Sequence, residues 1–235
     1  MSVALQFILT GIIGYLWGSI PAGYWMGKLL KGNDFDIRAY GSRKIGATNV
    51  LRTLGKGPAA IVLVFDLSKG VGPTLLATLA PFFQCNLGGM AWGPTLAAIA
   101  ALLGHTFPVF IGFKGGRGVL TGAGSLLIIS PLTFGIAAVA ALSTIALSRY
   151  VSLGSIISGL TSLVCGVLFF IVGQLHPAFF GRVNLAQLLF LVIVPGLVIV
   201  FHYDNIGRLL AGTERKIGQQ VKIDDNQPTP SPTAR

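Results

Sequence analysis

The sequence predicts an all-α integral membrane protein: a polytopic bundle of about seven transmembrane helices, with the N-terminus outside and the C-terminus cytoplasmic. Three observations support this fold class. Of the 235 residues, 53% are hydrophobic and only 10% are charged, whereas soluble domains contain roughly 25% charged residues. The apolar residues form long stretches. Nearly all of the 17 Lys and Arg residues lie between these stretches or after the last one.

Six apolar stretches reach about 20 residues, the length that a helix needs to cross ~30 Å of hydrocarbon. They cover residues 3–27, 58–83, 91–112, 118–148, 151–173 and 185–203. The first exceeds the ~7–15-residue core of a signal peptide, so we expect it to remain as a transmembrane helix. Small residues four apart in GYLWG (14–18) and GYWMG (23–27) favour close helix packing.

The fourth stretch is too long for one straight span, and Ser130-Pro131 lies near its middle. Proline disfavours helix at the preceding residue and cannot donate a hydrogen bond to the preceding turn. Seven cations between residues 28 and 56 place that loop in the cytoplasm. Two crossings within 118–148 then keep the basic segment after His202 on the same side. We therefore expect seven crossings, with a pass over 118–130 of only ~20 Å.

We expect one membrane domain over residues 1–216. Residues 217–235 are polar and rich in Pro, Ser and Thr, which predicts a disordered cytoplasmic tail. Cys85 and Cys165 are too few for a disulfide framework, and the three histidines lack metal-site spacing. We therefore expect no protein-bound metal and no cofactor. The net charge of +10 follows the positive-inside pattern, which argues against nucleic acid as a partner.

The first cytoplasmic segment, residues 36–56, is longer than a connection between helices needs. It contains Ser42, Thr48, Asn49 and Arg52 among glycines. Backbone N–H groups and hydroxyls there can receive phosphate oxygens, and Arg52 offers a bidentate fork. The alternative is a capped helix start with cations facing solvent.

The second segment reads GHTFPVFIGFKGGRGVLTG over residues 104–122. Glycines permit close backbone approach, and a following helix would point its positive end at an anion. The candidate phosphate-binding residues are Lys114, Gly115, Gly116, Arg117 and Gly118. No G-x-x-x-x-G-K-[ST] pattern is present, so ATP hydrolysis is not supported. The alternative is a glycine-rich turn with positive-inside cations.

The third segment follows the last span. His202 and Asn205 would share one face of a helix, and histidine is well suited to move a proton near neutral pH. The alternative is an interfacial helix with a snorkelling Arg208. Inside the second span, Asp66 and Lys69 also share a face, where charges are usually paired or functional. A purely structural ion pair is the alternative there.

The predicted topology places all three segments at one membrane face, which indicates a phosphorylated polar reactant meeting an apolar one. The sequence resembles the acyl-phosphate:glycerol-3-phosphate acyltransferases of bacteria, the PlsY family. The resemblance covers nearly all of residues 1–216. It rests on GSIPAGYWMGK (18–28), GATNVLRTLGK (46–56), DLSKG (66–70), GHTFPVFIGFKGGRGV (104–119) and the spacing of His202, Asn205, Arg208 and Glu214.

The chain departs from the family pattern at two places. The family commonly has Gly-Asn after the serine that corresponds to Ser42, whereas this chain has Arg43 and Lys44. No role is assigned to these two positions. Lysine is also the commoner residue where Arg117 stands, and the two cations differ in geometry.

The resemblance implies transfer of a fatty acyl group from acyl phosphate to the 1-hydroxyl of sn-glycerol 3-phosphate. The products would be lysophosphatidic acid and phosphate, in the first acylation step of phospholipid synthesis. It also implies a bacterial cytoplasmic (inner) membrane location, an active site facing the cytoplasm, contact with membrane lipid, and transient contact with the enzyme that makes acyl phosphate.

The resemblance assigns roles residue by residue. Either His202 or a substrate phosphate oxygen would accept the proton. The expected catalytic residues are Ser42, Arg52, His202 and Asn205; the substrate-binding residues are Thr48, Asn49, Lys114, Gly115, Gly116, Arg117 and Gly118; the supporting residues are Asp66, Lys69, His105 and Glu214.

Two other functions fit part of the pattern. A small phosphate or organic-anion transporter would also have glycine-interrupted spans and intramembrane charges such as Asp66 and Lys69. An acyl-CoA-dependent acyltransferase is the other, but Phe110, Gly181 and Gly207 stand where an H-x-x-x-x-D motif would need aspartate.

Overall fold

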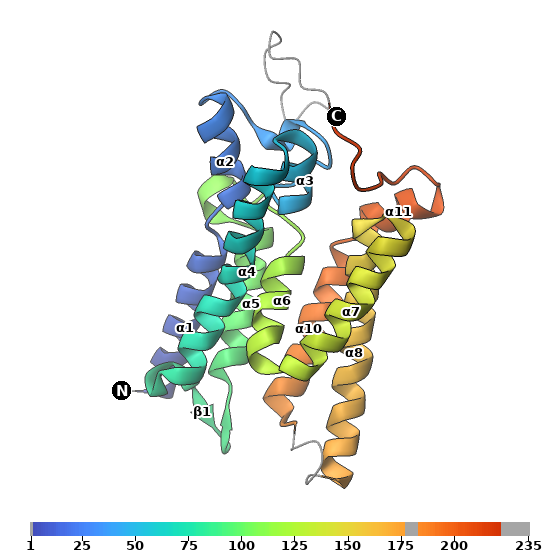
Figure 1. The fold of residues 1–235 in the computed structure, drawn as a ribbon. Coiled ribbons are helices and arrows are strands. Elements are labelled where there is room, and N and C mark those ends of the chain that lie inside the picture. The colour runs from blue at the N-terminus through green and yellow to red at the C-terminus, as the bar shows by residue number, and fades with distance from the viewer. Residues whose placement is uncertain (1, 177–182, 222–235) are drawn as a thin grey trace.

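The computed structural model describes residues 2–176 and 183–221. These residues are mostly helical, as predicted (Figure 1). The helices are α1 (Val3–Gly18), α2 (Ala22–Lys31), α3 (Ala47–Thr53), α4 (Lys56–Leu79), α5 (Gly93–Thr106), α6 (Val119–Ile129), α7 (Pro131–Ser148), α8 (Val151–Leu175), α10 (Leu185–Val200) and α11 (Tyr203–Leu210). Short 3₁₀ turns are η1 (Ile37–Ala39), η2 (Pro81–Gln84) and η3 (Val109–Ile111), and β1 (Asn86–Leu87) pairs antiparallel with β2 (Met90–Ala91).

Five helical segments in the described residues are long and apolar enough to cross a membrane: Val3–Lys31, α4, Gly93–Ile111, α7 and α8. α10 and α11 meet at a bend of 54° and together would make a sixth. α6 is apolar but shorter. Seven crossings would require α6 to count as a pass, so the number of crossings and the orientation of the termini stay predictions.

The long fourth stretch is broken at the expected place. α6 ends at Ile129 and α7 begins at Pro131, which occupies the first helical position, where proline is well tolerated. The Ser130 hydroxyl lies 2.7 Å from that of Thr133, so the polar groups at the break partner each other. The 11 residues of α6 span only ~16 Å.

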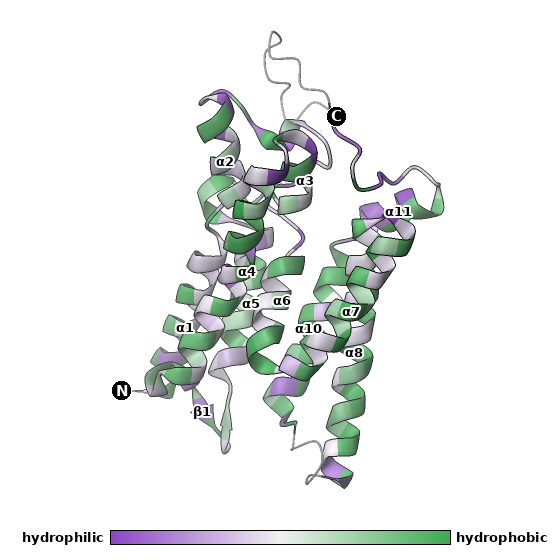
Figure 2. Cartoon of the chain, viewed as in Figure 1, coloured by the Kyte–Doolittle hydropathy of each residue, from purple (hydrophilic) through white to green (hydrophobic). Residues whose placement is uncertain are grey.

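The helices form two groups (Figure 1). α1 packs on α5, and α4 packs on α5 and α6; in the second group, α8 packs on α7 and α10. α3 and α11 lie at the same end of the bundle, which we call the polar end. Figure 2 shows that hydrophilic residues gather there, whereas the helices below are largely hydrophobic.

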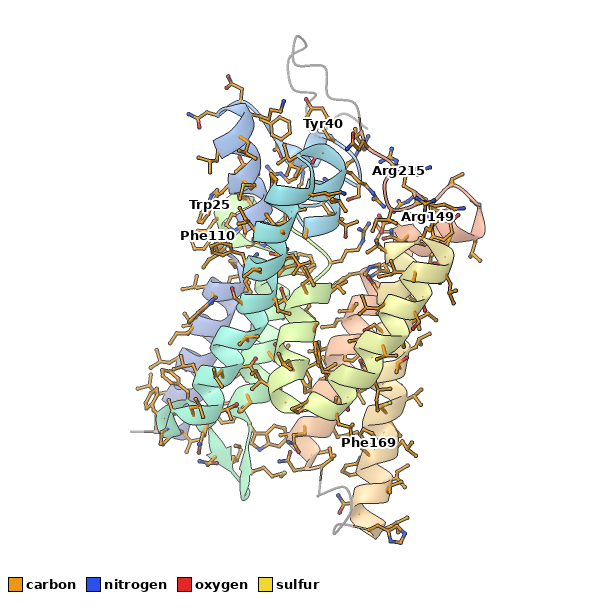
Figure 3. All side chains as sticks on the ribbon, viewed as in Figure 1. Trp25, Tyr40, Phe110, Arg149, Phe169 and Arg215 are labelled. Carbon is orange, nitrogen blue, oxygen red and sulfur yellow. The ribbon has the colours of Figure 1, made fainter. Side chains whose placement is uncertain are left out.

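Two exposed aromatic side chains lie just below the polar end. Trp25 and Phe110 are 52% and 55% exposed and lie at one level of the bundle (Figure 3). Tryptophan concentrates at membrane–water interfaces. Trp25 therefore favours an arrangement in which the polar end lies outside the hydrocarbon.

The predicted close packing at GYLWG is present. A Cβ atom on Gly18 would lie 2.1 Å from the carbonyl oxygen of Ala101, and one on Gly104 would lie 2.2 Å from that of Tyr15. The backbones of α1 and α5 are thus in direct contact, which only glycine permits at these positions.

Gly18→Val is expected to lower stability by about 1–3 kcal/mol, because the added side chain must push α1 away from α5. The measurement is the thermal unfolding midpoint in detergent. Gly135→Val in α7 is the matched control, since a Cβ there meets nothing within 4 Å. Equal midpoints for the two variants would contradict the proposed backbone contact.

Candidate active site

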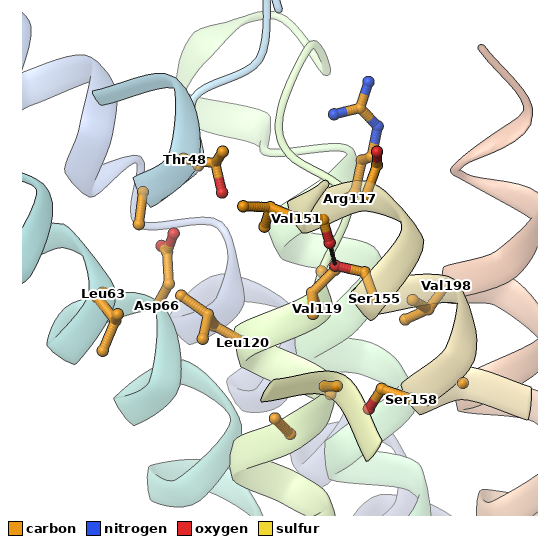
Figure 4. Close-up of a pocket in the computed structure, with 18 of the residues that line it drawn as sticks. Thr48, Leu63, Asp66, Arg117, Val119, Leu120, Val151, Ser155, Ser158 and Val198 are labelled. Carbon is orange, nitrogen blue, oxygen red and sulfur yellow. Dashed lines mark hydrogen bonds between the residues drawn. The ribbon is translucent and has the colours of Figure 1, made fainter. Parts of the chain in front are cut away.

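A main cavity of about 670 Å³ lies between the two helix groups. Its polar lining comes from all three segments singled out in the sequence, through Ser42, Lys44, Thr48, Asn49, Arg52, Arg117, Gly118, His202, Asn205 and Glu214. Along α6, α7 and α10 the lining becomes apolar and includes Leu126, Ala137, Phe190 and Val194, whereas α8 contributes four serines, Ser152, Ser155, Ser158 and Ser162. Figure 4 shows Thr48 and Arg117 above Leu120 and Val119 at this transition.

A side cavity of about 470 Å³ adjoins the main cavity at the polar end. The two share Ser42, Lys44, Arg52 and Glu214. The side cavity is further lined by Gly41, Arg43, Asp204, Arg208, Thr213 and Arg215. Arg43 and Lys44, which received no role from the sequence, thus contribute positive charge to the site.

Asn49 holds the loop that carries Ser42. Its side chain is 1% exposed; Oδ1 accepts the Ser42 N–H at 2.9 Å, and Nδ2 donates to the carbonyls of Tyr40 and Lys44. These bonds occupy Nδ2 and one acceptor position of Oδ1, so Asn49 positions Ser42. A direct contact between Asn49, which lines the main cavity, and substrate stays a prediction.

Arg52, in the last turn of α3, is 8% exposed yet forms no ion pair with any described carboxylate. Nη2 donates to the Arg215 carbonyl at 3.0 Å, and Nε is buried without a partner in the described part of the chain. Burial lowers the pKa of its guanidinium, and the nearby cations, Arg215 first among them, lower it further against the pull of Glu214. A buried guanidinium without a carboxylate partner is suited to bind an anion.

The segment after α11 runs across the polar end from one helix group to the other. The Ile217 N–H donates to the Arg149 carbonyl at 2.8 Å, and the Val221 N–H donates to the Arg52 carbonyl at 3.0 Å. Residues 217–221, the first part of the predicted tail, thus hydrogen-bond to both groups, and the disorder of the tail stays a prediction. Residues 222–235 lie outside the described residues.

The glycine-rich loop before α6 is held by backbone bonds. The Gly115 N–H donates to the Thr106 carbonyl at 3.1 Å, and the Gly116 N–H donates to the His105 carbonyl at 3.0 Å. The sequence predicted that these two N–H groups bind phosphate. In the structure they are occupied by the two carbonyls. The Lys114 side chain is exposed and lines neither cavity.

Arg117 is the cation that this loop delivers to the main cavity. Its Nη2 donates to Asp204 Oδ2 at 2.7 Å, while Nε is buried and has no partner among the described residues. Gly118 follows in the left-handed region at φ 74°, which favours glycine at this helix start. The loop thus brings the Arg117 guanidinium to the cavity together with the N-terminal end of α6, where Gly118, Val119 and Leu120 also line it.

His202 lies at the bend between α10 and α11 and is 3% exposed. Its Nδ1 is 2.7 Å from the Val198 carbonyl oxygen. A carbonyl only accepts, so Nδ1 carries a hydrogen and, in the neutral ring, Nε2 is an acceptor. The residue lines the main cavity with the chemistry of a proton acceptor.

Glu214 fixes the orientation of Asn205. Its Oε1 accepts from Asn205 Nδ2 at 2.8 Å and from Ser152 Oγ at 2.9 Å, and its Oε2 accepts from Arg208 Nε at 2.7 Å. Burial raises the pKa of the Glu214 carboxyl, but the hydrogen bonds from Arg208, Ser152 and Asn205 outweigh it and hold the pKa below its usual value. Asn205 Oδ1 is left buried and unpartnered within the described chain.

Asp66, Lys69 and His105 form a buried polar cluster in the wall of the main cavity. Lys69 Nζ lies 2.6 Å from Asp66 Oδ1 and 3.5 Å from His105 Nδ1. A Cβ on Gly116 would lie 2.0 Å from His105 Nε2, so the loop packs directly on this ring. The cluster supports the loop that carries Arg117. No group of three or more His, Cys, Asp or Glu side chains in residues 2–176 and 183–221 could hold a metal ion.

Four buried polar atoms in the described residues lack a hydrogen-bond partner: Arg52 Nε, Arg117 Nε, Asp204 Oδ1 and Asn205 Oδ1. Such atoms are rare, because an unpaired buried polar group costs ~1–3 kcal/mol. All four belong to residues that line the cavities. Two donors and two acceptors indicate a ligand with both anionic oxygens and hydroxyl groups.

Comparisons with known proteins point to one family. The family model described as glycerol-3-phosphate acyltransferase matches residues 8–212. The glycerol-3-phosphate acyltransferase of Desulforamulus reducens is 41% identical over 220 residues, which cover 93% of this chain and 98% of the relative. The one of Synechococcus elongatus is 40% identical over 223 residues, covering 94% and 99%.

Solved structures agree. The crystal structure of PlsY, an integral membrane glycerol 3-phosphate acyltransferase, in its glycerol 3-phosphate form superposes with a TM-score of 0.75 at 35% identity, covering 90% of this chain and 96% of that one. Its lysophosphatidic acid form gives a TM-score of 0.72 at 34% identity, covering 91% and 96%.

Proposed function

This chain belongs to the glycerol-3-phosphate acyltransferase family, and from that premise we propose that it transfers a fatty acyl group from acyl phosphate to the 1-hydroxyl of sn-glycerol 3-phosphate. The products are lysophosphatidic acid and inorganic phosphate, and the reaction is the first acylation step of phospholipid synthesis. The observation that supports this best is the main cavity, which joins a cationic end to a long apolar channel.

The donor explains why the site needs no nucleophile of its own. An acyl phosphate is a mixed anhydride with a good leaving group. The 1-hydroxyl oxygen bonds to the acyl carbon, the bond from that carbon to the phosphate oxygen breaks, and phosphate leaves. The hydroxyl proton passes to His202 Nε2 or to a phosphate oxygen. What remains for the protein is to position two reactants and to stabilise developing charge.

The polar residues divide this work. Asn205 Oδ1 can only accept, so it is suited to hold the attacking hydroxyl. Arg52 and Ser42 bind the phosphoryl group of one reactant, and the Arg117 guanidinium lies near the phosphoryl group of the other. The cations offset the repulsion between two dianions. Burial and the neighbouring Arg117 lower the pKa of the Lys44 ammonium, with Asp204 opposing, as expected for a cation crowded by other cations.

The proposed location is a bacterial cytoplasmic membrane with the polar end facing the cytoplasm. The clustering of cations at this end favours that orientation. Glycerol 3-phosphate then arrives from water, whereas the acyl donor arrives through the lipid or by transient contact with the enzyme that makes it.

Purified protein in detergent tests the proposal. With palmitoyl phosphate and glycerol 3-phosphate together, we expect phosphate release and lysophosphatidic acid. With palmitoyl phosphate alone, we expect only its spontaneous hydrolysis, and with glycerol 3-phosphate alone, no reaction. Palmitoyl-CoA in place of the phosphate is expected to give no product. Product from palmitoyl-CoA would overturn the donor assignment. No product from either, with glycerol 3-phosphate uptake into reconstituted vesicles, would favour the transporter alternative.

A further inference from the structure

Asp204 is a half-buried acceptor to which the sequence assigned no role. It lies in the first turn of α11 and lines the side cavity, next to Asn205, which lines the main cavity. Asp204 Oδ2 accepts from Arg117 Nη2 at 2.7 Å and from Arg208 Nη1 at 3.3 Å. Asp204 Oδ1 is buried and has no partner in the described part of the chain.

The free oxygen limits what the ligand can be. A carboxylate oxygen accepts hydrogen bonds and repels phosphate oxygens, so its partner must be a hydroxyl or another donor. The side cavity is also lined by cations that favour an anion, namely Arg43, Lys44, Arg52, Arg208 and Arg215. A ligand for this cavity therefore combines an anionic group with a hydroxyl.

The acceptors match the hydroxyls of the proposed substrate. Glycerol 3-phosphate has two hydroxyls, and Asn205 Oδ1 and Asp204 Oδ1 are two free acceptors on residues that line the two adjoining cavities. Only Asn205 lines the cavity with the apolar channel, where the acyl group must lie. The attacking 1-hydroxyl is therefore expected to donate to Asn205 Oδ1, which leaves the 2-hydroxyl to donate to Asp204 Oδ1.

We propose that Asp204 binds the 2-hydroxyl of glycerol 3-phosphate and thereby selects a glycerol backbone over other small hydroxyalkyl phosphates. This inference rests on the proposed function. It makes Asp204 a specificity-determining residue, and its ion pair with Arg117 links recognition of the hydroxyl to placement of a phosphate-binding cation.

The first test compares two acceptors on the wild-type protein with palmitoyl phosphate as donor. 3-Hydroxypropyl phosphate is glycerol 3-phosphate without the 2-hydroxyl. Its kcat/KM is expected to be roughly ten- to a hundredfold lower, because a hydrogen bond to a charged group is lost and the Asp204 oxygen stays unpaired. Equal kcat/KM for the two acceptors would overturn the role of Asp204. No product from glycerol 3-phosphate would overturn the proposed function itself.

The second test repeats the comparison on Asp204→Ala. The preference for glycerol 3-phosphate over 3-hydroxypropyl phosphate is expected to fall close to one, whereas any general loss through Arg117 lowers both acceptors alike. Asp204→Asn keeps the shape and an oxygen for Arg117, so its preference is expected to fall in the same direction. A preference that stays at the wild-type value in both variants would show that Asp204 acts only through Arg117, and would overturn the proposal.

Asp36→Ala is the matched control. Asp36 pairs with Arg38 at 2.7 Å, the same length as the pair of Asp204 with Arg117, and lines neither cavity. Its variant is expected to keep the full preference for glycerol 3-phosphate. A loss of preference there as large as in Asp204→Ala would count against a specific hydroxyl contact.

Discussion

Arg52→Ala is expected to lower kcat/KM for acylation of glycerol 3-phosphate by roughly ten- to a hundredfold. The guanidinium is buried, has no carboxylate partner in the described chain and belongs to a residue that lines both cavities. A hydrogen bond to a charged group contributes about 1.5–3 kcal/mol, and each 1.36 kcal/mol is tenfold in rate. Arg52→Lys should recover only part of the loss, because an ammonium lacks the planar fork.

The measurement is steady-state phosphate release by pure protein, with thermal midpoints to confirm folding. Lys28→Ala is the control: it removes a cation near the same end of the bundle that lines neither cavity, and it should retain activity. Full activity in both Arg52→Ala and Ser42→Ala would refute the assignment of this phosphoryl site.

Asp66→Ala is expected to destabilise the fold by about 3–5 kcal/mol. It leaves the ammonium of Lys69, which is 2% exposed, inside the bundle without a carboxylate. The double variant Asp66→Leu/Lys69→Met removes both charges and should recover most of the stability, because replacing a buried pair by apolar residues is often neutral. Thermal midpoints in one detergent compare the three proteins. A double variant no more stable than Asp66→Ala would argue that the charges do not act as a pair.

Much of the fold could be predicted from local features. The break at Ser130-Pro131 followed from proline and from the placement of cations, and the contact at Gly18 followed from small-residue spacing. Helix ends were less predictable: the first stretch was expected to end near 27, but α2 continues to Lys31. The β1–β2 hairpin was not predicted, since a strand of two residues leaves no periodic pattern.

In the site, residue type alone does not show which polar groups are available to a ligand. Gly115 and Gly116 looked able to bind phosphate, yet the carbonyls of Thr106 and His105 occupy their N–H groups. The Asn49 amide likewise makes hydrogen bonds within its own loop. Asp204 was missed for the opposite reason: nothing in the sequence shows which carboxylate oxygen is paired and which is free. Such availability depends on partners fixed only by the tertiary fold.

The contrast between the two ends of the main cavity gives the two products of the proposed reaction different exits. Lysophosphatidic acid, with its hydrocarbon tail in the apolar channel, passes into the bilayer, whereas inorganic phosphate dissolves in water. The products thus separate into different phases, where each is diluted or consumed independently. A catalyst leaves the equilibrium unchanged, so it is this removal of the two products into different phases, and not the cavity itself, that limits the back-reaction.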